Sequence, residues 1–228
     1  TRVSVASAGT QSTGDSLLPA LSGDGRYVAF LSSASNLVTG DTNGQPDLFV
    51  YDRQTAQTTR VSVASSGTQA NGASSTAALS SDGRYVAFAS SATNLVSGDT
   101  NAKSDIFVRD RTTNQTTRVS VASTGTQSTG DSLLPGLSSD GRFVVFASSA
   151  TNLVSGDTNA KFDIFVFDRQ TAQVKRASVG AGSLQSTADS LLPAVSGDGL
   201  VVGFTSGASN LVSGDTNAVS DVFVTNTP

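Results

Sequence analysis

Short apolar stretches alternate with longer polar stretches along this chain, and the apolar stretches have the pattern of β-strands. Residues 16–22 are largely apolar and lead into a Gly-Asp-Gly turn, which is a strong hairpin signal. Residues 26–32 and 47–53 are rich in β-branched and aromatic side chains. Residues 59–64 alternate apolar with polar positions, as expected for an outer strand with one face in solvent. No stretch has a helical period, so this part of the chain predicts four short strands.

This set of four strands recurs along the chain at a fixed spacing. The segment Thr-Arg-Val-Ser-Val begins at Thr1 and returns at Thr59 and Thr117, with a related copy at Lys175, so each step is 58 residues (from 1 to 59). Tandem four-stranded units that cannot bury their own faces are typical of β-propeller blades, whereas the rungs of a β-solenoid are usually shorter. The first three strands of each blade are expected near residues 15–53, 73–111, 131–169 and 189–227, and the outer strands near residues 1–6, 59–64, 117–122 and 175–180.

The phase of the repeat predicts how the propeller closes. The chain begins on an outer strand, residues 1–6, and ends just after a third strand, residues 221–224. Pairing of these two segments completes the last blade and covers a sheet edge that otherwise lies exposed. The expected fold is therefore all-β: a closed four-bladed β-propeller of four-stranded antiparallel blades, in which the N-terminal strand completes the last blade. Residues 1–228 form it as a single domain, and we expect a monomer.

The blade motif resembles that of a known family. Three repeats carry Ser-x-Asp-Gly-Arg-(Tyr/Phe)-Val-x-Phe, beginning at Ser22, Ser80 and Ser138, and a later strand reads Asp-(Ile/Leu)-Phe-Val-x-Asp-Arg from Asp47 onward. These sequences resemble the blade repeats of TolB-like (WD-type) β-propellers, although the loop between the second and third strands is longer here. The resemblance implies the propeller fold and an extracellular or periplasmic location, because such blades occur in secreted, periplasmic and peptidase-linked proteins.

The composition excludes several classes of protein. The 14 Lys and Arg against 18 acidic residues give a net charge of −4, and basic residues do not cluster, so we exclude nucleic-acid binding. The chain has no Cys or His, which excludes disulfides, thiolate sites and imidazole-ligated metals. No apolar run reaches the length of a membrane span. The polar groups that remain for binding or catalysis are mainly hydroxyl, amide and aspartate side chains.

The distribution of carboxylates argues against an enzyme. All 18 acidic residues are Asp, and they occupy five positions of the repeat, so every carboxylate has copies in other blades. Catalysis needs different groups in different roles around one substrate, and neither His, Cys nor Glu is present to supply them. The sequence therefore predicts a protein without enzymatic activity. We expect Asp52 and its copies either to form another turn or to form ion pairs between blades, with the arginine column that begins at Arg2 as the candidate partner.

One motif indicates calcium. Gly-Asp-Thr-Asn-x-x-x-Asp occurs once in each blade and places oxygen-bearing side chains at positions 1, 3 and 7 of a short loop, a spacing similar to that of Ca²⁺ loops. Two carboxylates per loop is a low charge, and the alternative is an Asx turn in which the Asp and Asn side chains bond nearby backbone amides. Both interpretations stay open. The candidate calcium ligands are Asp41, Asn43, Asp47, Asp99, Asn101, Asp105, Asp157, Asn159, Asp163, Asp215, Asn217 and Asp221.

The sequence indicates a scaffold or a binding module but identifies no ligand, and no cofactor is required. The loops near residues 7–14 and 33–46 are long and emerge on one face of the expected ring. A rigid scaffold commonly carries its binding residues on such loops, so we expect a protein or carbohydrate partner on this face. Two alternatives stay open: an engineered or consensus repeat propeller without an evolved ligand, and a calcium-dependent, lectin-like or protein-binding module with four equivalent sites.

Overall fold

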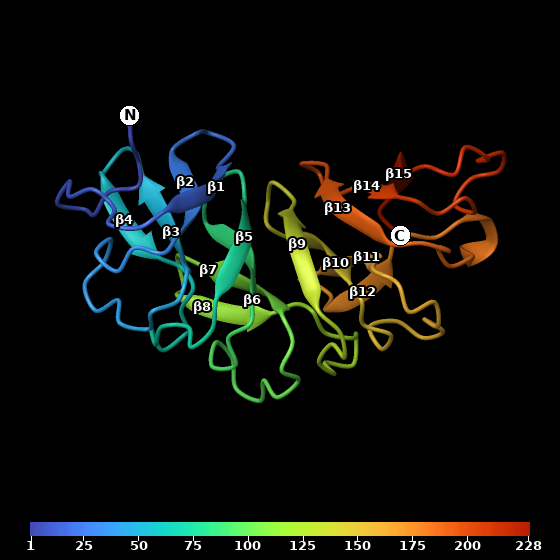
Figure 1. Cartoon of the computed structure of the whole chain (residues 1–228), viewed down its shortest axis with the longest axis horizontal. Coiled ribbons are helices and arrows are strands. Elements are labelled where there is room, and N and C mark those ends of the chain that lie inside the picture. Colours follow the sequence, from blue (N-terminus) through green and yellow to red (C-terminus); the bar gives the residue numbers. More distant parts are fainter.

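The computed structural model describes residues 1–228 as small antiparallel sheets that follow one another along an arc (Figure 1). Three sheets contain four strands each and the last contains three. A short 3-10 helix, Ala181–Ser183, is the one helical element. None of the structure's elements is a helix with the length and apolar character needed to cross a membrane.

Each sheet is one repeat of the sequence, with its strands side by side in chain order, and we refer to the sheets as blades 1 to 4. Blade 1 contains β1 (Ser16–Leu21), β2 (Tyr27–Ser32), β3 (Asp47–Asp52) and β4 (Gln57–Arg60), and blade 2 contains β5 (Ser74–Leu79), β6 (Tyr85–Ser90), β7 (Asp105–Asp110) and β8 (Gln115–Arg118). Blade 3 contains β9 (Ser132–Leu137), β10 (Phe143–Ser148), β11 (Asp163–Asp168) and β12 (Gln173–Arg176), and blade 4 contains β13 (Ser190–Val195), β14 (Val201–Ser206) and β15 (Asp221–Asn226).

The hydrophobic core lies between neighbouring blades. Leu48 and Val50 of β3 share one buried cluster with Phe88 and Phe107 of blade 2 and with Val61, which follows β4. The same columns of the repeat form the contacts between blades 2 and 3 and between blades 3 and 4. Burial of one such side chain contributes about 1.5–3 kcal/mol before the entropy cost of folding. Each blade is therefore stabilised mainly by the blade next to it.

The predicted closure between the first and last strands is not formed in this structure. β15 is hydrogen-bonded to β14 on one side and has no strand on its other side. The N-terminal segment lies with blade 1 at the opposite end of the arc from blade 4 (Figure 1). The repeated antiparallel blades agree with the predicted all-β architecture, but the fourth blade has three strands and the ring is open.

The outer strands end earlier than predicted. β4 covers Gln57–Arg60, whereas the sequence predicted a strand over residues 59–64, and β8 and β12 are shifted in the same way. The physical reason lies at Ser62, whose hydroxyl oxygen accepts the hydrogen bond of the Leu48 amide at 3.1 Å. A side chain thus replaces the backbone carbonyl that a longer outer strand would have supplied, and the ladder stops there.

The N-terminal segment packs on blade 1 in this structure. Thr1 and Arg2 are the only residues of this segment that correspond to β4 (residues 59 and 60, each 58 positions later). The following residues are used elsewhere, because Val3 and Val5 pack against the cluster of blade 1 that contains Tyr51.

Candidate functional site

The Asp-Thr-Asn loop of each blade ends at the first residue of the third strand. The last Asp of the loop is therefore held in place by the sheet. Asp47 is fully buried at the start of β3, where its Oδ1 accepts a hydrogen bond from the Ser62 hydroxyl at 2.5 Å. Its Oδ2 accepts hydrogen bonds from the Asn43 side-chain amide at 2.8 Å and from the Arg60 guanidinium at 3.2 Å. The two carboxylate oxygens therefore attach the end of β4 and the segment after it to the loop.

The guanidinium of Arg60 lies between two carboxylates. Its Nη1 is 3.1 Å from Asp41 Oδ1 and 3.2 Å from Asp47 Oδ2, and the side chain is 10% exposed. Burial raises the pKa of Asp41, and the charge of Arg60 opposes this effect. Arg118 and Arg176 occupy the same place in the next two blades, with ion-pair distances of 3.0 to 3.3 Å. In blades 1 to 3, an arginine side chain thus occupies the place between the two carboxylates where a calcium ion was considered.

Asn43 connects the loop to the segment that leads into blade 2. Its Oδ1 accepts a hydrogen bond from the Gln45 backbone amide at 3.1 Å, which is the Asx turn considered from the sequence. Its Nδ2 donates to the backbone carbonyl of Ala70 at 3.0 Å as well as to Asp47. Asp41 does not form the corresponding backbone bond, because it faces Arg60. The loop is held by hydrogen bonds that span two blades.

The structure brings together the first three sets of candidate calcium ligands around an arginine and leaves the fourth set without one. In blade 4 the Asn217 amide donates to Asp221 at 3.2 Å, and neither Asp215 nor Asp221 forms an ion pair. Three carboxylates do not converge at any point of the chain. Among the candidate calcium ligands, the carboxylates without an arginine partner are therefore those of blade 4.

The pairing of arginines with carboxylates differs from the one expected from the sequence. Asp52 pairs with Arg26 through two hydrogen bonds, at 2.9 Å from Nε and 2.6 Å from Nη2, and does not pair with the column that begins at Arg2. These bonds lower the pKa of Asp52 well below its usual range. The register of β2 against β3 decides this pairing, because Tyr27 is the cross-strand partner of Asp52 and places Arg26 beside it. The equivalent pairs are Arg84–Asp110 and Arg142–Asp168.

The Asp residues of the turns also have structural partners. Asp24 accepts hydrogen bonds from the Ser22 hydroxyl at 2.6 Å and from the Arg26 backbone amide at 2.9 Å, and these bonds lower its pKa. Asp131 accepts the Ser104 amide of the preceding blade at 3.0 Å. Carboxylates at the same repeat position thus perform the same structural task in successive blades.

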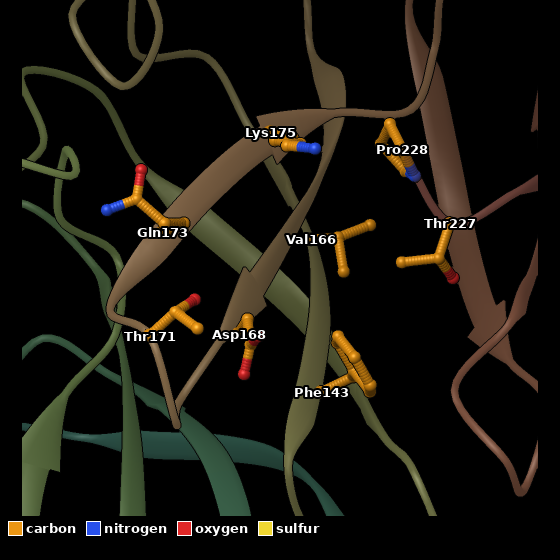
Figure 2. A pocket seen from close by; sticks show the side chains of 8 residues that line it. All are labelled: Phe143, Val166, Asp168, Thr171, Gln173, Lys175, Thr227 and Pro228. Atoms are coloured by element: carbon orange, nitrogen blue, oxygen red, sulfur yellow. The ribbon is translucent and has the colours of Figure 1, made fainter.

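A small cavity lies at the outer side of the junction between blades 3 and 4. Arg111 stacks 4.3 Å from the Tyr27 ring centroid and Arg169 stacks 4.2 Å from that of Tyr85, but Thr227 stands at the corresponding position of blade 4. Figure 2 shows the C-terminal residues facing the strands of blade 3 across this cavity of about 190 Å³. It is lined by Phe143, Val166, Asp168, Thr171, Gln173, Lys175, Thr227 and Pro228.

This cavity does not have the properties of an active site. Small-molecule sites usually enclose about 300–1,000 Å³, so a cavity of about 190 Å³ is small for one. Its carboxylate, Asp168, is already bound by Arg142 at 2.7 Å, and that contact lowers the pKa of Asp168. Lys175 is the other charged group that lines the cavity, and no second free acid or base accompanies it.

Two larger recesses lie beside the long loops. One, of about 680 Å³, is formed in blade 1 mainly by residues 6–8 and 35–41, and the other, of about 570 Å³, is formed in blade 3 by the equivalent residues 122–124 and 151–156. Asn36 holds the two loops of blade 1 together, because it accepts the Thr13 amide and donates to the Gln11 carbonyl. The two long connections therefore lie side by side.

Comparison with known proteins identifies the fold. No model of a sequence family matches the chain, and no curated protein sequence is significantly similar to it. Among solved structures, TolB from Acinetobacter baumannii superimposes with a TM-score of 0.53 and 20% identity over 96% of this chain and 42% of that chain. An oligogalacturonate lyase from Vibrio parahaemolyticus gives a TM-score of 0.54 and 13% identity over 92% of this chain and 49% of the lyase. The chain has a TolB-like β-propeller fold.

This likeness concerns the fold alone. A puromycin hydrolase also superimposes, with a TM-score of 0.51 and 14% identity over 93% of this chain and 27% of the hydrolase. The chain spans less than half the length of each of these three proteins. Because a lyase and a hydrolase are similar to it as well as TolB, the propeller fold does not determine whether such a chain catalyses a reaction.

Proposed function

We propose that the chain is a non-enzymatic scaffold or binding module. The observation that supports this proposal is the equivalence of its carboxylates: Asp47 and its copies bind a serine and an arginine, and Asp52 and its copies bind another arginine. General acid–base catalysis needs a titratable group that is free to exchange a proton with the substrate, whereas these carboxylates already bind side chains of the protein. Blades 1 to 3 repeat this arrangement three times, with no His, Cys or Glu in the chain.

The recesses beside the long loops are the proposed binding surface. Hydroxyl side chains such as Ser35 and Thr39 are exposed there, above the buried Leu37. A row of hydrogen-bonding groups over a small apolar floor suits an extended protein segment or a carbohydrate. The TolB-like blade motif further supports an extracellular or periplasmic location for this module.

A binding screen with recess-filling variants tests the proposal. The purified chain is applied to a glycan array and to a random-peptide display library, and chromogenic esters, phosphates and glycosides are assayed in parallel for turnover. We expect a bound glycan or peptide and no turnover. The signal should be lost in Thr39→Arg/Ser155→Arg, which fills both recesses, and kept in Gln54→Arg/Gln170→Arg, which adds the same charge to exposed turns. Turnover of a substrate would contradict the proposal, and failure to bind any probe would favour a repeat protein without an evolved ligand.

A calcium-dependent, lectin-like module is the second candidate. The observation that favours it is limited to blade 4, where Asp215 and Asp221 have no arginine partner. The other three loops already hold a guanidinium at the corresponding place. The glycan array is therefore also probed with calcium and with a chelator, and binding that requires calcium would favour this candidate over a calcium-independent module.

A further inference from the structure

The two ends of the arc carry complementary halves of one junction. Each internal junction joins the Asp-Thr-Asn loop and third strand of one blade to the segment that leads into the next blade. Blade 4 exposes the first half of such a junction, which we name the C-terminal face, formed by residues 215–224. Blade 1 carries the second half, which we name the N-terminal face, formed by residues 1–16 and Leu21.

The charges of the two faces are complementary. At the outer edge of blade 3, Arg176 at the end of β12 lies 3.1 Å from Asp157 and 3.3 Å from Asp163. The C-terminal face has the two corresponding carboxylates, Asp215 and Asp221, and neither has a cation. The N-terminal face has the corresponding arginine, Arg2, which is exposed and donates only to the neighbouring Gln11 side chain.

The polar contacts that accompany the arginine are complementary as well. In each internal junction a Gln bonds a Thr of the loop, an Asn amide donates to a backbone carbonyl, and a Ser amide donates to another carbonyl. Every partner has a copy on the two faces, one repeat away. The expected pairs across them are Gln11 with Thr216, Asn217 with the Ser12 carbonyl, and the Ser16 amide with the Ser220 carbonyl.

The apolar surfaces also match. Ile164 and Val166 of β11 are 0% and 3% exposed because blade 4 covers them, whereas the equivalent Val222 and Val224 of β15 are 75% and 69% exposed. At the internal junction Val195 of the following blade packs on this cluster. Its equivalent on the N-terminal face is Leu21, which is 63% exposed. The apolar side chains exposed on the N-terminal and C-terminal faces therefore occupy the repeat positions whose side chains are in contact at each internal junction.

We propose that a second copy of this chain supplies the missing half, so that the N-terminal face of one copy docks on the C-terminal face of the other. The chain's own N-terminal segment is held on blade 1, at the far end of the arc from β15 (Figure 1). A second copy instead brings the segment and blade 1 together, which is the arrangement that each internal junction uses.

The contact is head-to-tail, because different surfaces of the two copies meet. Such contacts produce either a closed ring or an open filament. Two copies place eight blades in one ring, at the upper end of the range of roughly four to eight blades in propellers, whereas three copies exceed it. The assembly is therefore a dimer with two identical junctions, in place of the monomer expected from the sequence.

The mass of the chain in solution is the first test. Sedimentation equilibrium and light scattering over a wide range of concentrations should give about twice the 23.0 kDa of one chain. A mass of one chain at every concentration would overturn the proposal. A ladder of larger species would overturn the two-copy ring in favour of a filament.

Charge reversals on each face provide the second test. Arg2→Glu on the N-terminal face and Asp215→Lys/Asp221→Lys on the C-terminal face should each weaken the dimer at least about tenfold, because a charge-assisted contact becomes a repulsive one. A mixture of the two variants should recover a dimer, since one copy retains an intact N-terminal face and the other an intact C-terminal face. The exposed Lys161→Glu is the control and should leave the dimer unchanged. A dimer insensitive to both reversals would overturn the proposed junction.

An engineered disulfide distinguishes a second copy from closure within one chain. Thr59 of β4 and Val50 of β3 are register partners in blade 1, so the proposal places Thr1 of one copy opposite Val224 of the other. The chain has no native cysteine to interfere. Oxidised Thr1→Cys/Val224→Cys should run at twice the single-chain mass on a non-reducing gel, while Thr1→Cys/Leu200→Cys should remain unlinked. A disulfide formed at single-chain mass would overturn the proposal in favour of intramolecular closure.

Discussion

The pKa values of two carboxylates in the same blade are shifted in opposite directions because their surroundings differ. The hydrogen bonds from Arg84 are the main reason that the pKa of Asp110 is lowered. Burial is the main reason that the pKa of Asp99 is raised, although Arg118 lies beside it. The direction of each pKa shift decides whether protonation of that carboxylate in acid lowers or raises the stability of the fold.

We expect Asp110→Asn to lower the free energy of unfolding at pH 7 by about 1 kcal/mol, as for a partly exposed ion pair. The folded-state pKa of Asp110 lies below the unfolded-state value of about 3.9, so the stabilisation is complete above that value and is lost as the pH falls toward the folded-state pKa. Urea denaturation of both proteins at several pH values should therefore give a difference that shrinks in acid. A difference that does not change with pH would contradict this role of the Arg84–Asp110 pair.

At the scale of the element, a turn of one blade lies directly against the second strand of the blade before it. Gly83, in the turn between β5 and β6, has a φ of 67°, and a Cβ at this position would lie 2.1 Å from the Tyr27 ring. Gly141 and Gly199 approach the Tyr85 and Phe143 rings in the same way. Each of these turns therefore needs a glycine for its backbone conformation and for the close approach of the ring.

We expect Gly83→Ala to destabilise the protein more than Gly98→Ala does. Both glycines have a positive φ, of 67° and 73°, so both substitutions introduce about 1–2 kcal/mol of backbone strain. Only Gly83 faces a neighbouring side chain, whose displacement should add about 1–3 kcal/mol. Chemical denaturation of the two variants measures this difference. Equal losses would mean that the Tyr27 ring moves aside without cost.

The sequence predicts the second and third strands well because their apolar residues are buried between blades. It misplaces the outer strands, because the alternation of residues 59–64 continues past Arg60 while the Ser62 hydroxyl ends the ladder. It also misassigns the arginine partners. Arg26 and Arg60 recur with the same period, so the repeat alone does not distinguish which of them reaches Asp52. That choice depends on the register of β2 against β3.

For the molecule as a whole, we expect calcium to leave the melting temperature unchanged. Arg60, Arg118 and Arg176 already neutralise the carboxylates of three of the four candidate loops. A genuine site would add about 2.7 kcal/mol of stability at a hundredfold excess of calcium over its Kd. Thermal denaturation with calcium, with magnesium and with a chelator measures the effect. A rise in melting temperature with calcium alone would show that the loops bind the ion despite the arginines.

The number of blades is predictable from the sequence, whereas the closure of the ring is not. A repeat with a fixed period specifies how one unit packs on the next, and the structure forms this contact three times. The same residues complete a junction whether they belong to the same chain or to another one. The phase of the repeat therefore identifies Arg2 as a counterpart of Asp215 and Asp221 without indicating which copy supplies it.

The uniformity of the blade junctions also has a consequence for the gene that encodes such a chain. Every junction uses residues of two adjacent units and none from elsewhere, so duplication or loss of one 58-residue unit (from 1 to 59) leaves each remaining junction with all of its partners. Unequal recombination between repeats can thus change the length of the protein in whole units without any compensating substitution.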